Sequence, residues 1–231
     1  MNAQASRQIL RYEKPRRLVH WIGALTFLML LFTGVLLLAS PLAFLAAGGW
    51  SRLLHRIGAM FFVGLPFVYA ILNPEKVKEL LAESFTYGRE DWEWFKRMPA
   101  YFFGRTKNLP PQGRINAGQK LHHATTFLSF AVVAVSGYVM WFGKSSLGAN
   151  GLAFAAMVHD VSMLVLTVMF IGHLYFTFLY DALSAMLTGY VSEEYARMEH
   201  SKWLESLGEK EFEADTRELY RAEKQVEEIR S

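Results

Sequence analysis

The sequence has 231 residues, of which 52% are hydrophobic and only 19% are charged, and its formal net charge is +3. Soluble domains contain about 25% charged residues, and the apolar residues of this chain gather in long blocks, so the composition excludes an ordinary soluble protein. The chain has no cysteine, which excludes disulfides, thiolate zinc sites and Cys-ligated iron–sulfur clusters within it.

Four apolar blocks in the sequence are long enough to cross a bilayer as helices. They cover residues 18–39, 53–72, 121–142 and 152–180. About 20 helical residues cross the hydrocarbon core of a membrane. We therefore expect an all-α fold, an integral membrane four-helix bundle, followed by a polar C-terminal helical tail.

The basic residues are distributed unequally between the segments that flank these blocks. Five precede the first block (Arg7, Arg11, Lys14, Arg16 and Arg17), and nine lie between the second and the third (Lys76, Lys78, Arg89, Lys96, Arg97, Arg105, Lys107, Arg114 and Lys120). The two opposite loops, 40–52 and 143–151, contain one basic residue each. Because lysine and arginine mark the cytoplasmic side, the sequence predicts a multi-pass protein of the bacterial inner membrane with both termini in the cytoplasm.

An aromatic segment lies between the second and third blocks. Residues 91–103 read D-W-E-W-F-K-R-M-P-A-Y-F-F. Aromatic rings interspersed with Lys and Arg are typical of a segment that lies on lipid headgroups, and Pro99 is expected to interrupt any helix there. Basic residues beside a membrane ordinarily set topology, so we expect the lipid bilayer, and no nucleic acid, as a partner.

The charge balance reverses near the C-terminus. Residues 1–192 contain 17 basic and 9 acidic residues, whereas residues 193–231 contain 7 basic and 12 acidic ones. The second region is rich in helix formers such as Glu, Lys, Arg and Ala. We predict a four-helix transmembrane domain over 1–192 and a cytoplasmic polar helical tail over 193–231. This tail is either a solvated helix or a docking helix for a partner or a second copy of the chain.

Four histidines lie within the apolar blocks or at their ends, where ionisable residues are costly and mark functional sites. They are His20, His55, His159 and His173. His159 and His173 are fourteen residues apart in one predicted helix. Both therefore point to nearly the same side, about 21 Å apart along the axis. That separation is too long for one metal ion and fits two centres at different depths.

The topology supplies one partner for each histidine of that helix. His55 lies near the exterior side, as His159 does, and His20 lies near the cytoplasmic side, as His173 does. Two imidazoles from facing helices are the axial ligands that a low-spin b haem needs, so we predict two non-covalent bis-histidine haem sites. For each histidine alone, the alternative is a hydrogen-bonded structural residue. Zinc is not expected, because no three or four ligands converge.

Five short stretches, in their order and spacing, resemble the gamma subunit, a cytochrome b, of membrane-bound formate dehydrogenases. They are R-Y-E-K-P-R-R-L-V-H-W at 11–21, L-H-R-I-G at 54–58, G-R-I-N-A-G-Q-K at 113–120, V-H-D-V-S at 158–162 and G-H-L-Y at 172–175. The resemblance implies that His20 and His173 hold the cytoplasmic haem, and that His55 and His159 hold the exterior one. Membrane cytochromes of nickel–iron hydrogenases and thiosulfate reductases share this plan of four helices and two haems, so the partner enzyme stays open.

The resemblance also places a quinone next to the cytoplasmic haem, at Asn116, Gly118, Gln119 and His173. Side-chain amides can hydrogen-bond a quinone carbonyl, and a glycine permits close approach of a ligand to the backbone. Taken alone, the stretch N-A-G-Q is more typical of a turn that begins a helix.

Three more ionisable residues lie close to these sites in the sequence. Asp160 follows His159 and points about 100° away from it, so we expect it to pair with Arg56 or Arg52 or to contact a partner subunit. His122 and His123 begin the third block. They are either interfacial histidines or a proton relay to the reduced quinone.

Together these features predict an electron-transfer subunit of a membrane oxidoreductase complex. By the resemblance, a catalytic partner oxidises formate and an iron–sulfur partner passes the electrons to two b haems, from which menaquinone or ubiquinone receives them. The chain itself does not oxidise formate. The alternatives are the cytochrome b subunit of a hydrogenase or thiosulfate reductase, and a histidine-dependent proton-coupled transporter, which would need polar groups near the midplane. A higher oligomer is left open.

Overall fold

The computed structural model describes residues 7–180 and 182–208, and nearly all of their regular structure is helical. Four long helices correspond to the predicted spans: α1 (Lys14–Leu38), α2 (Trp50–Leu72), α5 (Ala117–Phe142) and α6 (Ala149–Leu179). All four, α2 together with the 3₁₀ segment that precedes it, are long and apolar enough to cross a membrane. The predicted all-α membrane four-helix bundle is therefore confirmed.

Each long helix begins three or four residues before the apolar block that predicts it. In α1, for example, the first turn takes in Lys14, Pro15 and Arg16. Proline suits this position because the first amides of a helix have no intrahelical partner. The apolar pattern thus marks the part expected in hydrocarbon, and the helices continue into the polar flanks.

The chain divides into two compact units. The bundle unit comprises Leu10–Thr86 and Gln119–Tyr190, and the polar unit comprises Met1–Ile9, Tyr87–Gly118 and Val191–Ser231. Two three-residue strands, β1 (Gln8–Leu10) and β2 (Tyr190–Ser192), form a two-stranded sheet. The predicted domain boundary at residue 192 stays a prediction.

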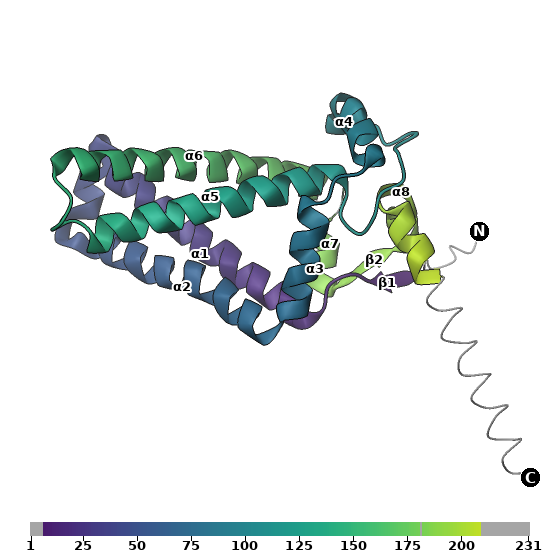
Figure 1. Ribbon diagram of the computed structural model, residues 1–231, viewed down its shortest axis with the longest axis horizontal. Coiled ribbons are helices and arrows are strands. Elements are labelled where there is room, and N and C mark those ends of the chain that lie inside the picture. Colours follow the sequence, from purple (N-terminus) through teal and green to yellow (C-terminus); the bar gives the residue numbers. More distant parts are fainter. Residues whose placement is uncertain (1–6, 181, 209–231) are drawn as a thin grey trace, which may run out of the picture. The chain divides into compact units, whose positions relative to one another are not determined.

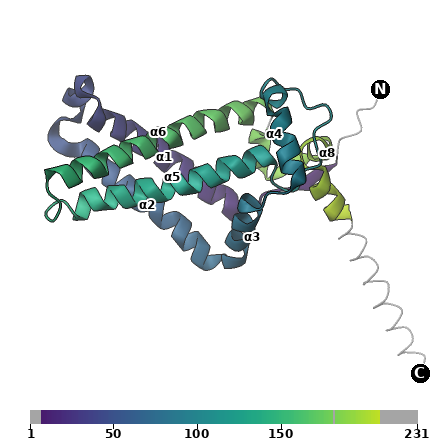
Figure 2. The ribbon, with the colours of Figure 1, turned by 45° about the horizontal axis from the view of Figure 1, so that its top comes forward.

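Within the bundle unit, α1, α2, α5 and α6 lie side by side (Figures 1 and 2). A 3₁₀ segment, η1 (Ser40–Gly49), joins α1 to α2. It ends in Gly48 and Gly49, whose φ angles are 79° and 76°. Glycine adopts this left-handed conformation without strain, so the glycine pair turns the chain back into α2. The shorter α3 (Pro74–Phe85) follows α2 directly.

The start of α1 is fixed to the chain that follows α6. Arg17 donates hydrogen bonds to the carbonyls of Met186, Leu187 and Thr188 at the end of α7 (Leu183–Thr188). A cation is favourable at a helix C-terminus, where carbonyl groups lack intrahelical partners. Arg17, which the sequence analysis counts only as a topology determinant, is therefore also a structural clamp.

The polar unit contains α4 (Arg89–Phe102) and α8 (Glu193–Glu199). The Asp91 carboxylate accepts a hydrogen bond from the Gly88 amide at 2.7 Å and so caps α4. The expectation that Pro99 interrupts a helix is wrong, because α4 continues through it to Phe102. Pro99 lies in the last turn, where only one ladder hydrogen bond is lost and little helix remains to be bent.

The described part of the predicted tail is helical, over α8 and again over 201–208. It is not a simple solvated helix, because Ala196, Glu199, His200 and Trp203 are all buried. The remainder of the tail, 209–231, lies outside the described residues.

Candidate functional site

The structure brings the four predicted histidines together as two pairs within the bundle unit. The ring centroids of His20 and His173 are 6.2 Å apart, with an angle of 58° between the ring planes. Those of His55 and His159 are 6.3 Å apart, with an angle of 63°. Because His159 and His173 both belong to α6, the pairs lie about 21 Å apart along that helix.

The separation within each pair fits two imidazoles that bind one metal between them. Two metal–nitrogen bonds of about 2 Å, together with the half-widths of two rings, add up to about 6 Å. In the part of the chain that the structure describes, no three His, Cys, Asp or Glu side chains converge to hold a metal ion. Each pair therefore offers the two protein ligands that a haem iron needs.

His122 also lies beside His173, but in a different geometry. Their ring centroids are 5.3 Å apart and the planes are inclined by only 20°, so the rings are stacked. Stacked rings face each other with their π surfaces, whereas axial ligands must direct nitrogen lone pairs at one metal. The geometry therefore favours His20 over His122 as the partner of His173.

His123 makes a structural contact instead. Its Nδ1 lies 3.0 Å from the hydroxyl of Ser84, which is fully buried in α3. Since Ser84 already donates to the Leu80 carbonyl at 2.6 Å, the hydroxyl accepts from His123. A proton-relay role for either histidine stays a prediction.

A layer of four phenylalanines lies between the two histidine pairs, with one ring from each long helix. Phe27 contacts Phe62 and Phe170, with centroids 6.1 Å and 5.3 Å apart, and Phe62 contacts Phe130 at 5.3 Å. Phe27 and Phe62 each follow a histidine of their own helix by seven residues, about 10 Å along the axis. Phe27 and Phe62 therefore lie near the midpoint between the pairs. Phe170 precedes His173 by only three residues, about 4.5 Å along the axis.

The glycines near the histidines divide into two groups. A Cβ atom built on Gly23, Gly64 or Gly172 would meet nothing within 4 Å. A Cβ atom on Gly58 would lie 2.6 Å from the Met29 side chain. The first three thus leave room for a flat ring system beside the helix backbone, whereas Gly58 serves helix packing.

The predicted quinone-binding residues divide between the two units. Asn116 and Gly118 belong to the polar unit, and Gln119 and His173 belong to the bundle unit. Asn116 is only 3% exposed, and its side-chain amide donates to Glu199 Oε2 at 3.2 Å. The Tyr101 hydroxyl donates to the same oxygen at 3.0 Å. Glu199 thereby fixes the orientation of the Asn116 side chain.

Two more hydrogen bonds hold the segment before α5 to the same part of the chain. His200 Nδ1 donates to the Gly113 carbonyl at 2.8 Å, and the Lys202 amide donates to the Gln112 carbonyl at 3.0 Å. The Gln112 side chain in turn accepts from the Ala117 amide at 2.7 Å, at the start of α5. Residues 199–202 therefore hold the whole segment 112–117 in place.

Packing also explains why residue 118 is a glycine. A Cβ atom there would lie 2.7 Å from the ring of Trp94, which is only 1% exposed. Gly118 is therefore required by the interior of the polar unit, and its contact with a quinone stays a prediction.

Asp160 does not pair with the arginines expected for it. In residues 7–180 and 182–208, no ion pair joins Asp160 to Arg52 or Arg56. The Arg56 guanidinium instead lies over the Trp141 ring, 5.2 Å from its centroid, which is a favourable cation–π arrangement. A contact between Asp160 and a partner subunit stays a prediction.

Two groups of the polar unit titrate away from their ordinary range. Partial burial, reinforced by the nearby Asp91 carboxylate, raises the pKa of Tyr87. The hydrogen bond from Lys202, 2.6 Å long, lowers the pKa of the exposed Glu90. Neither group is near the histidine pairs in the sequence, and both shifts reflect local structure.

Several site residues escaped the sequence analysis. Thr33 and Ser136 hydrogen-bond the histidines of one pair, and Glu199 holds Asn116. A hydroxyl in an apolar helix ordinarily bonds its own backbone, so Thr33 and Ser136 gave no signal. Glu199 lies 83 residues from Asn116, in a stretch with many charged residues. A single glutamate in such a stretch cannot be recognised as a site residue from the sequence.

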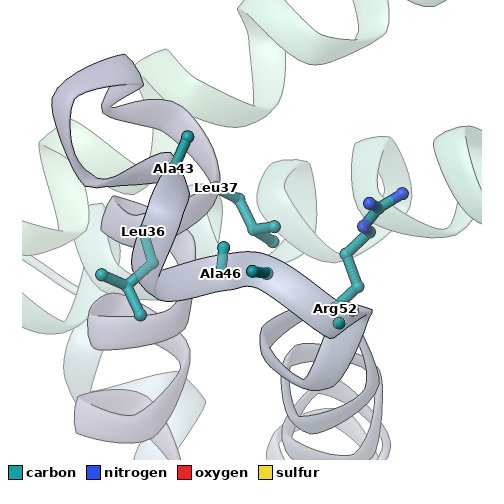
Figure 3. Close-up of a pocket in the computed structure, with 8 residues that line it drawn as sticks. Leu36, Leu37, Ala43, Ala46 and Arg52 are labelled. Atoms are coloured by element: carbon teal, nitrogen blue, oxygen red, sulfur yellow. The ribbon is translucent and has the colours of Figure 1, made fainter.

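A shallow hollow of about 480 Å³ lies where α1, η1 and α2 meet (Figure 3). Its lining includes Leu36, Leu37, Ala43, Ala46 and Arg52. None of the paired histidines contributes to it, so it is separate from the site described above.

The known proteins whose sequences resemble this chain are described as cytochromes b. The sequence profile of the family described as "Prokaryotic cytochrome b561" matches residues 11–189. The formate dehydrogenase cytochrome b556 subunit of Haemophilus influenzae is 23% identical over 204 residues, which cover 85% of this chain and 82% of that protein. In Escherichia coli K12, the cytochrome b556(fdo) subunit of formate dehydrogenase is 24% identical over 84% of this chain and 91% of its own length. The nitrate-inducible cytochrome b556(Fdn) subunit is 20% identical over 92% and 98%.

Proposed function

The chain belongs to the prokaryotic cytochrome b561 family, and from this membership we propose that it is the cytochrome b subunit of a formate dehydrogenase-like membrane complex. It carries electrons across the bilayer to a quinone. The similar proteins of two organisms are named as the cytochrome subunits of formate dehydrogenases. The chain has no cysteine, so iron–sulfur clusters and formate oxidation belong to partner subunits.

The observation that carries this proposal is the presence of two similar imidazole pairs. The ring centroids are 6.2 Å apart in one pair and 6.3 Å apart in the other. We propose that His20 and His173 hold one b haem and that His55 and His159 hold the other. When bound, the two haems supply one-electron transfer between two depths of the membrane. The chain's own residues fix their separation.

The distribution of basic residues supports an orientation with both termini in the cytoplasm of a bacterium. In that orientation the His55–His159 pair lies nearer the exterior, where the iron–sulfur partner would deliver electrons. The His20–His173 pair lies nearer the cytoplasm. Electrons thus enter beside one pair and leave beside the other.

We propose that menaquinone or ubiquinone binds at Asn116, Gly118, Gln119 and His173. Support comes from the chemistry of the side-chain amides, which can donate to a quinone carbonyl, and from the hydrogen bond to Glu199 that fixes the orientation of Asn116. A pre-oriented donor loses less conformational entropy when it binds its ligand. Reduction of the quinone takes two electrons and two protons, and the protons come from the cytoplasmic side.

Stopped-flow reoxidation of the reduced haems by a menaquinone analogue tests this function. Asn116→Ala should leave both haem spectra intact and slow reoxidation, because a lost hydrogen bond weakens binding by about 1 kcal/mol, roughly fivefold. The matched control is Asn150→Ala, an exposed asparagine in the first turn of α6, which should reoxidise at the wild-type rate. Unchanged rate and affinity in both Asn116→Ala and Gln119→Ala would move the quinone site elsewhere.

A further inference from the structure

The two helical hairpins of the bundle unit hold one histidine each in the same way. In the first, Thr33 Oγ1 of α1 lies 2.9 Å from Nδ1 of His55 on α2. In the second, Ser136 Oγ of α5 lies 3.2 Å from Nδ1 of His159 on α6. The hydroxyl precedes its histidine by 22 residues in one hairpin and by 23 in the other.

The direction of these hydrogen bonds follows from the single proton of each hydroxyl. Thr33 Oγ1 lies 2.7 Å from the Met29 carbonyl, and Ser136 Oγ lies 2.7 Å from the Val132 carbonyl. A carbonyl can only accept, so each hydroxyl donates to its own helix. Its lone pair is then left to accept from the Nδ1–H group of the histidine.

His159 makes a second hydrogen bond that leads to the same tautomer. Its Nδ1 lies 3.0 Å from the Val133 carbonyl, which can only accept. Both histidines therefore have their proton on Nδ1 and their lone pair on Nε2. This is the arrangement in which an outer partner orients a metal-binding imidazole and increases its basicity.

A glycine beside each hydroxyl brings the ring close to the helix backbone. A Cβ atom on Gly34 would lie 3.4 Å from His55 Cε1, and one on Gly137 would lie 3.1 Å from His159 Cε1. The pairs Thr33-Gly34 and Ser136-Gly137 thus form matching hydroxyl–glycine cradles. Each cradle fixes both the tautomer and the position of its imidazole.

The other histidine pair has no such cradle at His20. Nδ1 of His20 is buried and has no hydrogen-bond partner among the residues that the structure describes. Thr26, the hydroxyl residue that follows His20 in α1, donates only to the carbonyls of Ile22 and Gly23. His20 therefore lacks the polarising hydrogen bond that His55 and His159 each make.

We propose that Thr33 and Ser136 are positioning residues that make His55 and His159 the stronger electron donors, so that their haem has the lower midpoint potential of the two. An imidazole whose Nδ1–H is hydrogen-bonded donates more charge and favours the ferric state. This inference rests on the proposed binding of two b haems. It deepens that proposal, because the difference in midpoint potential makes electron transfer towards the His20–His173 pair energetically downhill.

Redox titration of the purified, haem-loaded chain, followed by visible and EPR spectroscopy, tests the inference. Thr33→Val should move the lower-potential component to a more positive potential. Ser136→Ala should move it less, because the Val133 carbonyl still accepts from Nδ1 of His159. At a fixed ambient potential, the reduced-to-oxidised ratio of this component should rise by up to about tenfold. The higher-potential component should stay in place. Thr33→Ser keeps the acceptor oxygen and should retain the wild-type potential.

The matched controls are Thr26→Val and Ser162→Ala, which remove hydroxyls that bond only carbonyls of their own helix. Both components should keep their potentials in these variants. The inference is overturned if neither component moves in Thr33→Val and Ser136→Ala, or if the component that moves is the one lost in His20→Ala. A wild-type chain that binds no haem would instead overturn the proposed function itself.

Discussion

The bundle unit and the polar unit place their buried polar groups in opposite ways. In the bundle unit, single histidines lie in long apolar helices and meet across them as pairs, 6.2 and 6.3 Å apart. In the polar unit, Tyr101, Asn116 and Glu199 come from segments up to 98 residues apart and form one hydrogen-bonded cluster. Helix periodicity determines the first arrangement, and long-range contacts determine the second.

The two arrangements also differ in what should fail when a residue is removed. A histidine pair is held by helices that pack without it, so its loss should remove a bound group and leave the fold intact. The polar cluster is part of the interior of its unit, and an unsatisfied buried donor is costly. Substitutions of the paired histidines should therefore change spectra, and removal of the shared acceptor Glu199 should change stability.

The largest expected effect is the loss of one haem on removal of either member of a histidine pair. His55→Ala and His159→Ala should lose the same redox component, and His20→Ala and His173→Ala the other, because one imidazole cannot hold a six-coordinate low-spin iron. Redox titration of the four variants checks this. If His122→Ala lost a component and His20→Ala kept both, the pairing would be wrong.

A smaller, local loss of stability is expected in the polar unit. Glu199→Ala leaves Tyr101 and Asn116 without their shared acceptor, so local opening of residues 112–117 should become easier by about 2 kcal/mol, roughly thirtyfold in exchange rate. Hydrogen exchange followed by mass spectrometry measures this, with the exposed Glu205→Ala as the control. Equal protection of residues 112–117 in both variants would show that Glu199 does not hold this segment.

The hydroxyl–glycine cradles permit a finer comparison. In Gly137→Ala the new methyl group would lie 3.1 Å from the His159 ring, so the ring must move by a few tenths of an ångström, whereas in Gly34→Ala the distance to His55 is 3.4 Å, an ordinary contact. We expect altered EPR g-values of the corresponding haem in Gly137→Ala and smaller changes in Gly34→Ala. The reverse order would contradict the cradle geometry.

The smallest effect concerns the surface pair of Glu90 and Lys202. Because Lys202 lowers the pKa of Glu90 in the folded state, their pair stabilises the polar unit above the ordinary carboxyl pKa. This contribution is lost as the pH falls through the lowered pKa. Lys202→Ala should raise the Glu90 pKa towards its ordinary value, measured by NMR titration. High salt should also raise the Glu90 pKa in the wild type, because the pair is exposed and its attraction is screened. An unchanged Glu90 pKa in Lys202→Ala would show that Lys202 does not lower it.

The same contrast explains what the sequence could predict. The four spans and the pairing of His20 with His173 and of His55 with His159 follow from apolar length and helix spacing, both of which are local properties. The effect of Pro99 could not be predicted from residue type alone, because its cost depends on its place in the last turn of α4. Glu199 and His200 could not be recognised, because a buried polar cluster has no local pattern and its contacts lie 83 and 87 residues away.

The binding of two b haems is the central claim, and a pyridine haemochrome assay on the purified chain tests it most directly. The two imidazole pairs predict about two non-covalent b haems per chain, extractable by acidified solvent, and a reduced spectrum that titrates in two steps. A value near zero, or a single haem with a single redox step in the intact wild-type chain, would contradict the account.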